Sequence, residues 1–322
     1  MGMQRGFRSI LVPLDGYPLA EEALPVAETL ARRCGATLHL VTVEPPTPLV
    51  LASDVAAVAQ EMQDDTARAM RAYLQRAAAK AGRNGCSAAS ALLAGGPAER
   101  IAAYARQHRI ELVVMTTHGR GGLSRLCVGS VAERLLRTLE VPMLLLRPRE
   151  GPQPTEYRRI LAAIGERAEL ELIEPALTLG GLAGTTSYVL AHVVEEPPAI
   201  VAALPWYVPH VVPLGIQARQ SEARHYLGPL AERLSQHGVV TEAQVTVGGP
   251  VAAELLGLAR TAGADLIAIG THRRRGLERV VLGSVARELV RRSDVPVLIT
   301  PLLTPADHAL PPEIHAGFTE VS

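Results

Sequence analysis

The chain has 322 residues, enough for about two domains that each bury a hydrophobic core. Its 32 Lys and Arg residues balance its 32 Asp and Glu residues, so no net charge attracts nucleic acid or an anionic membrane. Three widely spaced cysteines without a CxxC pair disfavour a disulfide framework and a zinc knuckle. No apolar run approaches the ~20 residues of a membrane helix, and no charged-then-apolar leader opens the chain, so we expect a cytoplasmic protein.

Apolar runs alternate with segments of helical period in the first half of the chain. The apolar runs predict strands at residues 10–14, 37–43, 87–93, 112–115 and 142–146. The helical patterns predict helices at residues 19–33, 54–81 and 97–108, and another after Gly129. Strands and helices in alternation predict a parallel sheet with helices on both faces. Ligands of such sheets bind beyond the carboxyl ends of the strands, where Asp15, Val43 and residues 116–130 fall.

The second half repeats this order. A proline-containing linker, residues 148–156, separates a first domain, residues 1–147, from a second domain, residues 157–301. The second domain has strands predicted at residues 160–164, 187–194, 241–247, 266–270 and 297–300. Residues 302–322 form a polar tail that we expect to lie outside the fold. The predicted fold class is α/β, with two tandem doubly wound parallel five-stranded sheets.

One connection in the second half is unusually apolar. Residues 195–216 hold five prolines among Ile, Val, Leu, Trp and Tyr side chains. A loop of this composition is expected to cover something, either its own domain or a partner. We interpret it as a lid or a contact surface in preference to a catalytic element.

A glycine-rich stretch, Thr116 to Ser130, lies between a predicted strand and a predicted helix. Glycines allow close backbone approach, and the free amides of the helix start favour phosphate, although a tight strand-to-helix turn requires glycine too. The stretch recurs as Gly270 to Ser284, with the Thr-His, Gly-Leu and Gly-Ser-Val-Ala segments repeated. The chain is therefore a tandem duplication.

These residues resemble the universal stress proteins, in a tandem two-domain form, over nearly the whole chain apart from the tail. The family loop has the form Gly-x2-Gly-x9-Gly-Ser/Thr, and its later positions match Gly119, Gly129 and Ser130. The resemblance implies a fold similar to the adenine nucleotide alpha hydrolases and to the Rossmann fold. It also implies that the first domain binds ATP or AMP, with Mg²⁺ as a companion of the phosphates. The base and ribose would contact Pro13, Asp15, Val43 and Met115, and the phosphates would contact Gly119, Gly129 and Ser130.

Each half departs from the family pattern. In the first half, Thr116 stands in place of the opening glycine, next to His118. In the second half, the loop positions that match are Gly270, His272, Gly283 and Ser284. Arg273 replaces the middle glycine and Gly165 replaces Asp15, so we expect the second site to be impaired. Arg273 either fills the phosphate seat or donates hydrogen bonds to phosphate.

Several residues have simpler interpretations. The two loop histidines, His118 and His272, either brace the turn or act in catalysis, and Asp15 could cap the helix that begins near Pro18. With Lys80 as the only lysine there is no Walker loop, and no general base stands beside a nucleophile.

We therefore expect a nucleotide-binding stress-response protein, not an enzyme, that acts through ligand-linked conformation or assembly. The alternatives are a nucleotide-independent interaction or dimerisation module and a slow ATP hydrolase. The resemblance implies an intramolecular pseudo-dimer that packs through the last strands, near Val141–Leu146 and Val295–Thr300. It leaves open a further homodimer.

Overall fold

The computed structural model describes residues 6–44, 53–117, 128–165, 170–196, 211–236, 238–272 and 283–302. Within these ranges it describes all side chains except those of residues 53–57, 170–172, 211–214 and 272. His118, Gly119, Arg273 and most of the apolar connection at 195–216 lie outside the described residues.

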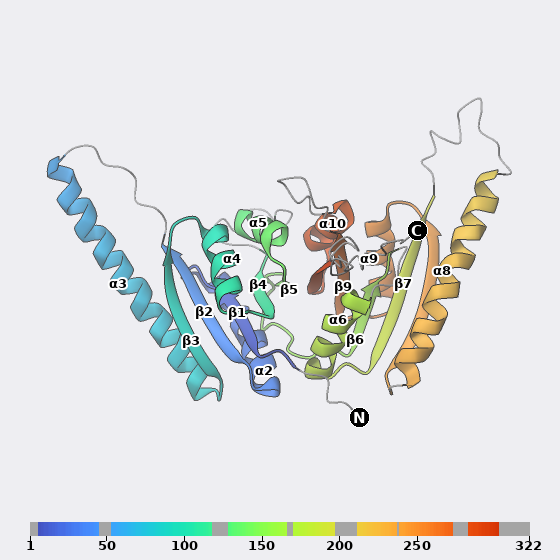
Figure 1. The fold of residues 1–322 in the computed structure, drawn as a ribbon, viewed down its shortest axis with the longest axis horizontal. Coiled ribbons are helices and arrows are strands. Elements are labelled where there is room, and N and C mark those ends of the chain that lie inside the picture. The colour runs from blue at the N-terminus through green and yellow to red at the C-terminus, as the bar shows by residue number, and fades with distance from the viewer. Residues whose placement is uncertain are drawn as a thin grey trace, which may run out of the picture.

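The first half alternates strands and helices as the sequence predicts (Figure 1). Its elements are β1 (Ser9–Pro13), α1 (Pro18–Glu21), α2 (Leu24–Cys34), β2 (Thr37–Glu44), α3 (Ser53–Arg83), β3 (Ser87–Ala94), α4 (Pro97–Gln107), β4 (Leu112–Thr116), α5 (Ser130–Thr138) and β5 (Met143–Leu146).

The second half repeats the order. Its elements are β6 (Arg159–Ala163), α6 (Leu170–Ala183), β7 (Ser187–Glu195), α8 (Val211–Gln236), β8 (Val240–Gly248), α9 (Val251–Thr261), β9 (Leu266–His272), α10 (Ser284–Arg292) and β10 (Val297–Leu302). Residues 211–216, which we predicted as part of a loop, belong to α8. Pro213 is compatible with this because it lies in the first turn, where the helix needs no amide hydrogen.

The ten strands form one sheet in the order β3-β2-β1-β4-β5-β10-β9-β6-β7-β8. Each half contributes five parallel strands, so the predicted fold class is confirmed for each half. The halves join through β5 and β10, which pair antiparallel with Leu145 opposite Val297. This is the contact that the resemblance implied, and it turns the two expected sheets into one continuous sheet.

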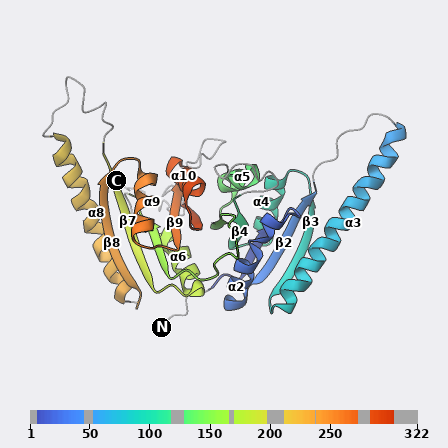
Figure 2. The same cartoon turned by 180° about the vertical axis from the view of Figure 1, so that it is seen from behind.

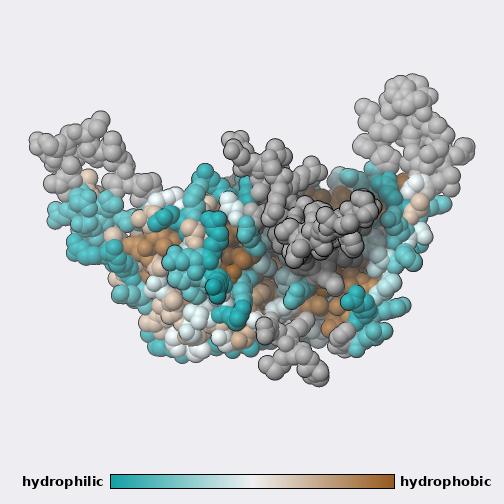
Figure 3. All heavy atoms as spheres, in the orientation of Figure 1, coloured by the Kyte–Doolittle hydropathy of each residue, from teal (hydrophilic) through white to brown (hydrophobic). Residues whose placement is uncertain are grey.

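Helices cover both faces of this sheet, and side chains alternate between two apolar layers. Ile10 and Leu40 pack on the face covered by α2 and α3, whereas Leu11 and Val41 pack on the face covered by α4 and α5. Figure 2 shows the opposite view, with α3 and α8 as the outer walls of the molecule. Apolar patches remain visible between the more hydrophilic helices of both halves (Figure 3).

The predicted helix at 19–33 is interrupted. It forms as α1 and α2, which are separated at Glu22 and Ala23. Pro25 supplies no amide hydrogen and is tolerated only in a first turn, so a second helix start lies immediately before it.

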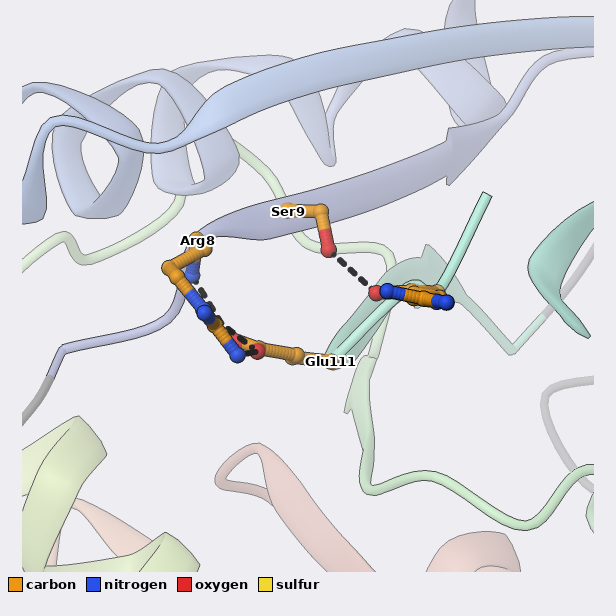
Figure 4. A network of polar contacts seen from close by, with 4 residues as sticks. Arg8, Ser9 and Glu111 are labelled. Carbon is orange, nitrogen blue, oxygen red and sulfur yellow. Dashed lines mark hydrogen bonds and ion pairs between the residues drawn. The ribbon is translucent and has the colours of Figure 1, made fainter. Parts of the chain in front are cut away.

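Polar contacts hold β1 beside β4 at the amino end of the sheet (Figure 4). The Glu111 carboxylate accepts hydrogen bonds from the Arg8 amide at 2.7 Å and from Arg8 Nε at 3.0 Å. The Ser9 hydroxyl donates to the Arg109 carbonyl at 2.7 Å. The second half repeats the arrangement, with Asp265 accepting from the amides of Arg158 and Arg159. These contacts fix the two central strands at whose opposite ends the candidate site lies.

Side chains from the linker region also tie the halves together. Gln153 is buried and donates to the Glu22 carboxylate at 2.7 Å and to the Arg147 carbonyl at 2.8 Å. Arg147 donates to the Ser293 carbonyl at 3.0 Å across the junction. The linker is therefore packed into the structure and the halves contact each other beyond the shared strands.

Candidate functional site

The candidate site of the first half lies at the carboxyl ends of β1 and β4, which are neighbours in the sheet. Asp15 follows β1, and residues 117 and 129 flank the loop after β4. In the strand order β3-β2-β1-β4-β5, the connections leave β1 and β4 toward opposite faces, and sheets of this kind bind ligands at such a switch point of their carboxyl edge. The predicted ligand residues of the first half are thus placed around one switch point.

Asp15 occupies the turn before α1. Its side chain is half-buried, and Oδ1 accepts a hydrogen bond from the Tyr17 amide at 3.0 Å. Tyr17 is the N-cap residue of α1, so Asp15 supports the helix start from two residues upstream and is not itself the cap. A carboxylate has about four acceptor positions. This bond therefore leaves acceptor capacity for a ligand.

The start of α5 is fixed to the end of β4. The Thr117 amide donates to the Leu146 carbonyl at 2.8 Å, and the Gly129 amide donates to the Thr117 carbonyl at 2.7 Å. Gly129 is the N-cap residue and provides no side-chain bond to the helix. The first amides of a helix have no partner inside it and carry a partial positive charge. The exposed residue Ser130 and the two amides after it can therefore hold an anion.

The other predicted first-half residues lie at the same edge. Pro13 is the last residue of β1 and Val43 the residue before the last of β2, and both are half-buried. Met115 and Thr116 are buried in β4 at 8% and 5% exposure. The structure therefore brings together the described members of the predicted first site. His118 and Gly119 stay predictions.

The second-half loop differs in its first position. Gly270 lies in β9, and a Cβ there would be 2.4 Å from the Leu302 side chain. Packing against Leu302 is therefore a sufficient reason for this glycine. Gly283 and Ser284 begin α10 in the same way that Gly129 and Ser130 begin α5. His272 ends β9, but neither its side chain nor Arg273 is described.

The second half contains a cavity of about 470 Å³ at the carboxyl edge of its strands. The register of β6 and β7 matches that of β1 and β2, so Ala163, Gly165 and Val193 correspond to Pro13, Asp15 and Val43. All three line the cavity. Its volume falls in the range of small-molecule sites, roughly 300–1,000 Å³. Sequence reasoning did not anticipate a cavity in the half with the larger departures from the motif.

A histidine and a tyrosine form the polar wall of this cavity. The Tyr226 hydroxyl donates to the Gly165 carbonyl at 2.7 Å, and His192 Nδ1 lies 2.9 Å from the Ile164 carbonyl and 2.8 Å from the Tyr226 hydroxyl. A carbonyl oxygen only accepts, so this network assigns a proton to Nδ1. Sequence reasoning passed over Tyr226, although Tyr73 holds the same place before its own strand, β3.

Two classes of feature are not found in the described part of the chain. There, no group of three or more His, Cys, Asp or Glu side chains is arranged to hold a metal ion. No helix within the described ranges is both long and apolar enough to cross a bilayer.

Comparison with known proteins identifies the family. The model of the universal stress protein family matches residues 6–147 and 156–301. A universal stress protein of Methanocaldococcus jannaschii is 27% identical over 144 residues, covering 44% of this chain and 82% of the relative. One from Thermus aquaticus is 33% identical over 141 residues, covering 44% of this chain and 99% of the relative.

The fold comparison agrees. The crystal structure of a universal stress protein from Archaeoglobus fulgidus has a TM-score of 0.66 at 18% identity, covering 91% of this chain and 98% of that chain. Both halves have the same strand order, and the family model spans both of them. The chain therefore belongs to the universal stress protein family, in a tandem two-domain form.

Proposed function

We propose that the chain is a stress-response protein whose first half binds an adenine nucleotide, ATP or AMP, and which acts through ligand-linked conformation or assembly. The observation that carries the proposal is the position of Asp15. Its half-buried carboxylate follows β1, directly beside the strand that leads to the uncapped start of α5. The Asp15 carboxylate can accept hydrogen bonds from a base or ribose. The N-terminus of α5 favours an anionic phosphate.

By the same argument, we expect nucleotide binding at the second site to be impaired. Gly165 has no carboxylate, and its carbonyl already accepts the Tyr226 hydroxyl. A nucleotide there would lose the ribose-end partner and keep only the start of α10. Mg²⁺ would enter with the phosphates of ATP, and the described residues form no cage for it.

Isothermal titration of ATP and AMP into the full chain tests the proposal. We expect one site per chain, and Asp15→Ala should weaken binding at least tenfold, about 1.4 kcal/mol. Ser130→Ala and Ser284→Ala are matched substitutions at equivalent helix starts. Only Ser130→Ala should weaken binding.

Three outcomes separate the alternatives. Absence of nucleotide binding would favour an interaction or dimerisation module, and measurable ATP turnover would favour a hydrolase. Equal weakening by both serine variants would contradict an impaired second site. Light scattering with and without ATP tests whether the ligand changes the assembly state.

A further inference from the structure

The cavity of the second half extends around the carboxyl edge of the sheet onto both of its faces. Helices α8 and α9 both pack against β7, from opposite faces. Ile164 lines the cavity from the apolar layer on the α8 side, and Ala163 and Val193 line it from the layer on the α9 side. The latter two correspond to Pro13 and Val43, the predicted nucleotide contacts of the first half. The part of the cavity beside α8 therefore lies beyond the positions predicted to contact a nucleotide.

The charges around this cavity do not suit a phosphate. Among the described lining residues, Glu195, Arg219 and Glu222 carry charge, and all three are exposed. Two carboxylates and one guanidinium leave an excess of negative charge, which disfavours a polyanion. The remaining lining is mainly aliphatic, contributed by β6, β7, β9, α8 and α9. An uncharged and largely apolar molecule is therefore the occupant that this lining favours.

The lining also offers one hydrogen-bond acceptor on the α8 side. His192 lines the cavity, and its Nδ1 donates to the Ile164 carbonyl at 2.9 Å. In the neutral imidazole the other nitrogen, Nε2, is then an acceptor. Within the described part of the chain Nε2 makes no hydrogen bond, and it is not sealed from solvent. A molecule in the cavity can therefore donate to it.

We propose that this cavity binds a small, uncharged, largely apolar molecule that donates one hydrogen bond to His192 Nε2. The apolar body of the molecule packs against the aliphatic lining, and its N–H or O–H group points toward α8. The inference goes beyond the proposed function, because it concerns a different half of the chain and a different class of ligand.

N-phenyl-1-naphthylamine is the probe for this test, because it is uncharged, largely aromatic and carries a single N–H. Its fluorescence rises when it passes from water into an apolar site. Titration into the full chain should show saturable binding of one probe per chain. Excess ATP should leave the probe bound, since the cavity does not suit a polyanion.

Gly165→Leu is the variant that fills the cavity. Gly165 lines it, and no heavy atom lies within 4 Å of the position of its missing Cβ. Leucine there should weaken probe binding about tenfold or more, because its side chain takes the volume that the probe needs. Gly228→Leu in α8 is the matched control, since its Cβ also meets open space but the residue does not line the cavity.

Thermal unfolding without the probe checks that both variants fold. The open space at both positions predicts melting temperatures close to that of the wild type. If Gly165→Leu unfolds at a lower temperature, Gly165→Val adds less volume and repeats the test.

A second compound tests the hydrogen bond to His192. In 1-benzylnaphthalene a CH₂ group replaces the N–H of the probe, so the shape is kept and the donor is lost. Its affinity, measured by competition with the probe, should be about tenfold weaker. Equal affinity of the two compounds would contradict the hydrogen bond.

Three results would overturn the inference as a whole. The wild-type chain fails to bind the probe, ATP displaces the probe, or the cavity-filling variants and Gly228→Leu bind it with equal affinity. Asp15→Ala should bind the probe as the wild type does. Failure of the chain to bind ATP or AMP would remove the proposed function and leave this inference standing.

Discussion

Gly180 in α6 is required by the tyrosine that packs against it. A Cβ at Gly180 would lie 1.8 Å from the Tyr188 hydroxyl oxygen and 2.9 Å from the ring. Tyr188 is 3% exposed and donates to the Ala176 carbonyl at 3.4 Å, so it cannot move aside without disturbing the core. We expect Gly180→Ala to lower the free energy of unfolding by about 1–3 kcal/mol, as measured by urea denaturation.

Gly257 in α9 provides the control for this substitution. No heavy atom lies within 4 Å of the position of its missing Cβ. Alanine there should raise the free energy of unfolding by about 0.5–1 kcal/mol through helix propensity alone. If both variants changed stability in the same direction, the steric explanation for Gly180 would be wrong.

His39 in β2 lies in a cluster with Tyr104 and His108, and its protonation is coupled to folding. His39 is 9% exposed, its Nδ1 lies 3.0 Å from the Tyr104 hydroxyl, and Tyr104 stacks on His108 at 4.0 Å. Burial lowers the pKa of His39, and the charge of His108 lowers it further. The folded chain then binds fewer protons than the unfolded chain, so stability is full above pH 6.5 and falls as the pH drops below it.

The repeat supplies the variant that tests this pH dependence. Val189 and Leu258 stand in the second half where His39 and Tyr104 stand in the first. The double variant His39→Val, Tyr104→Leu should flatten the loss of unfolding free energy between about pH 7 and pH 5. Urea titrations across this interval measure the slope, and a slope equal to that of the wild type would contradict the assignment.

Local patterns predicted the elements well and their contacts poorly. Apolar runs such as residues 112–115 mark buried parallel strands directly, and every predicted strand forms within about two residues of its expected bounds. The break before Pro25 and the extension of α8 into a proline-rich segment depend on which turn each proline occupies. The presence of a proline in the sequence does not by itself determine which turn of a helix it occupies.

Within the candidate site, the described residues that we predicted as ligand contacts could be located because they follow a linear motif. The contact between His192 and Tyr226 could not, because a β7 residue and an α8 residue meet only after the chain has folded. The second-half cavity is likewise formed by side chains from several elements, including α8, whose start we had taken for a loop.

For the molecule as a whole, the β5–β10 pairing predicts how a half behaves alone. All four residues of β5 are buried, and the strand is an edge of the first half without β10. A chain ending at residue 151 therefore exposes an apolar edge strand, which is a template for pairing. We expect this fragment to dimerise through β5, as measured by light scattering, with the full chain as the control. A folded, monomeric fragment would show that the edge is protected in another way.

The antiparallel junction at the centre of the sheet also affects how the two sites can change. In an assembly of two identical chains, any substitution near one ligand is copied into the other. In this chain the two halves have separate sequences but are joined in one sheet through β5 and β10. Asp15 and Gly165 can therefore differ without weakening the contact between the halves. Fusion thus guarantees one edge with the Asp15 carboxylate and one edge with Gly165 in every molecule, a fixed ratio that free subunits would have to reach by sorting.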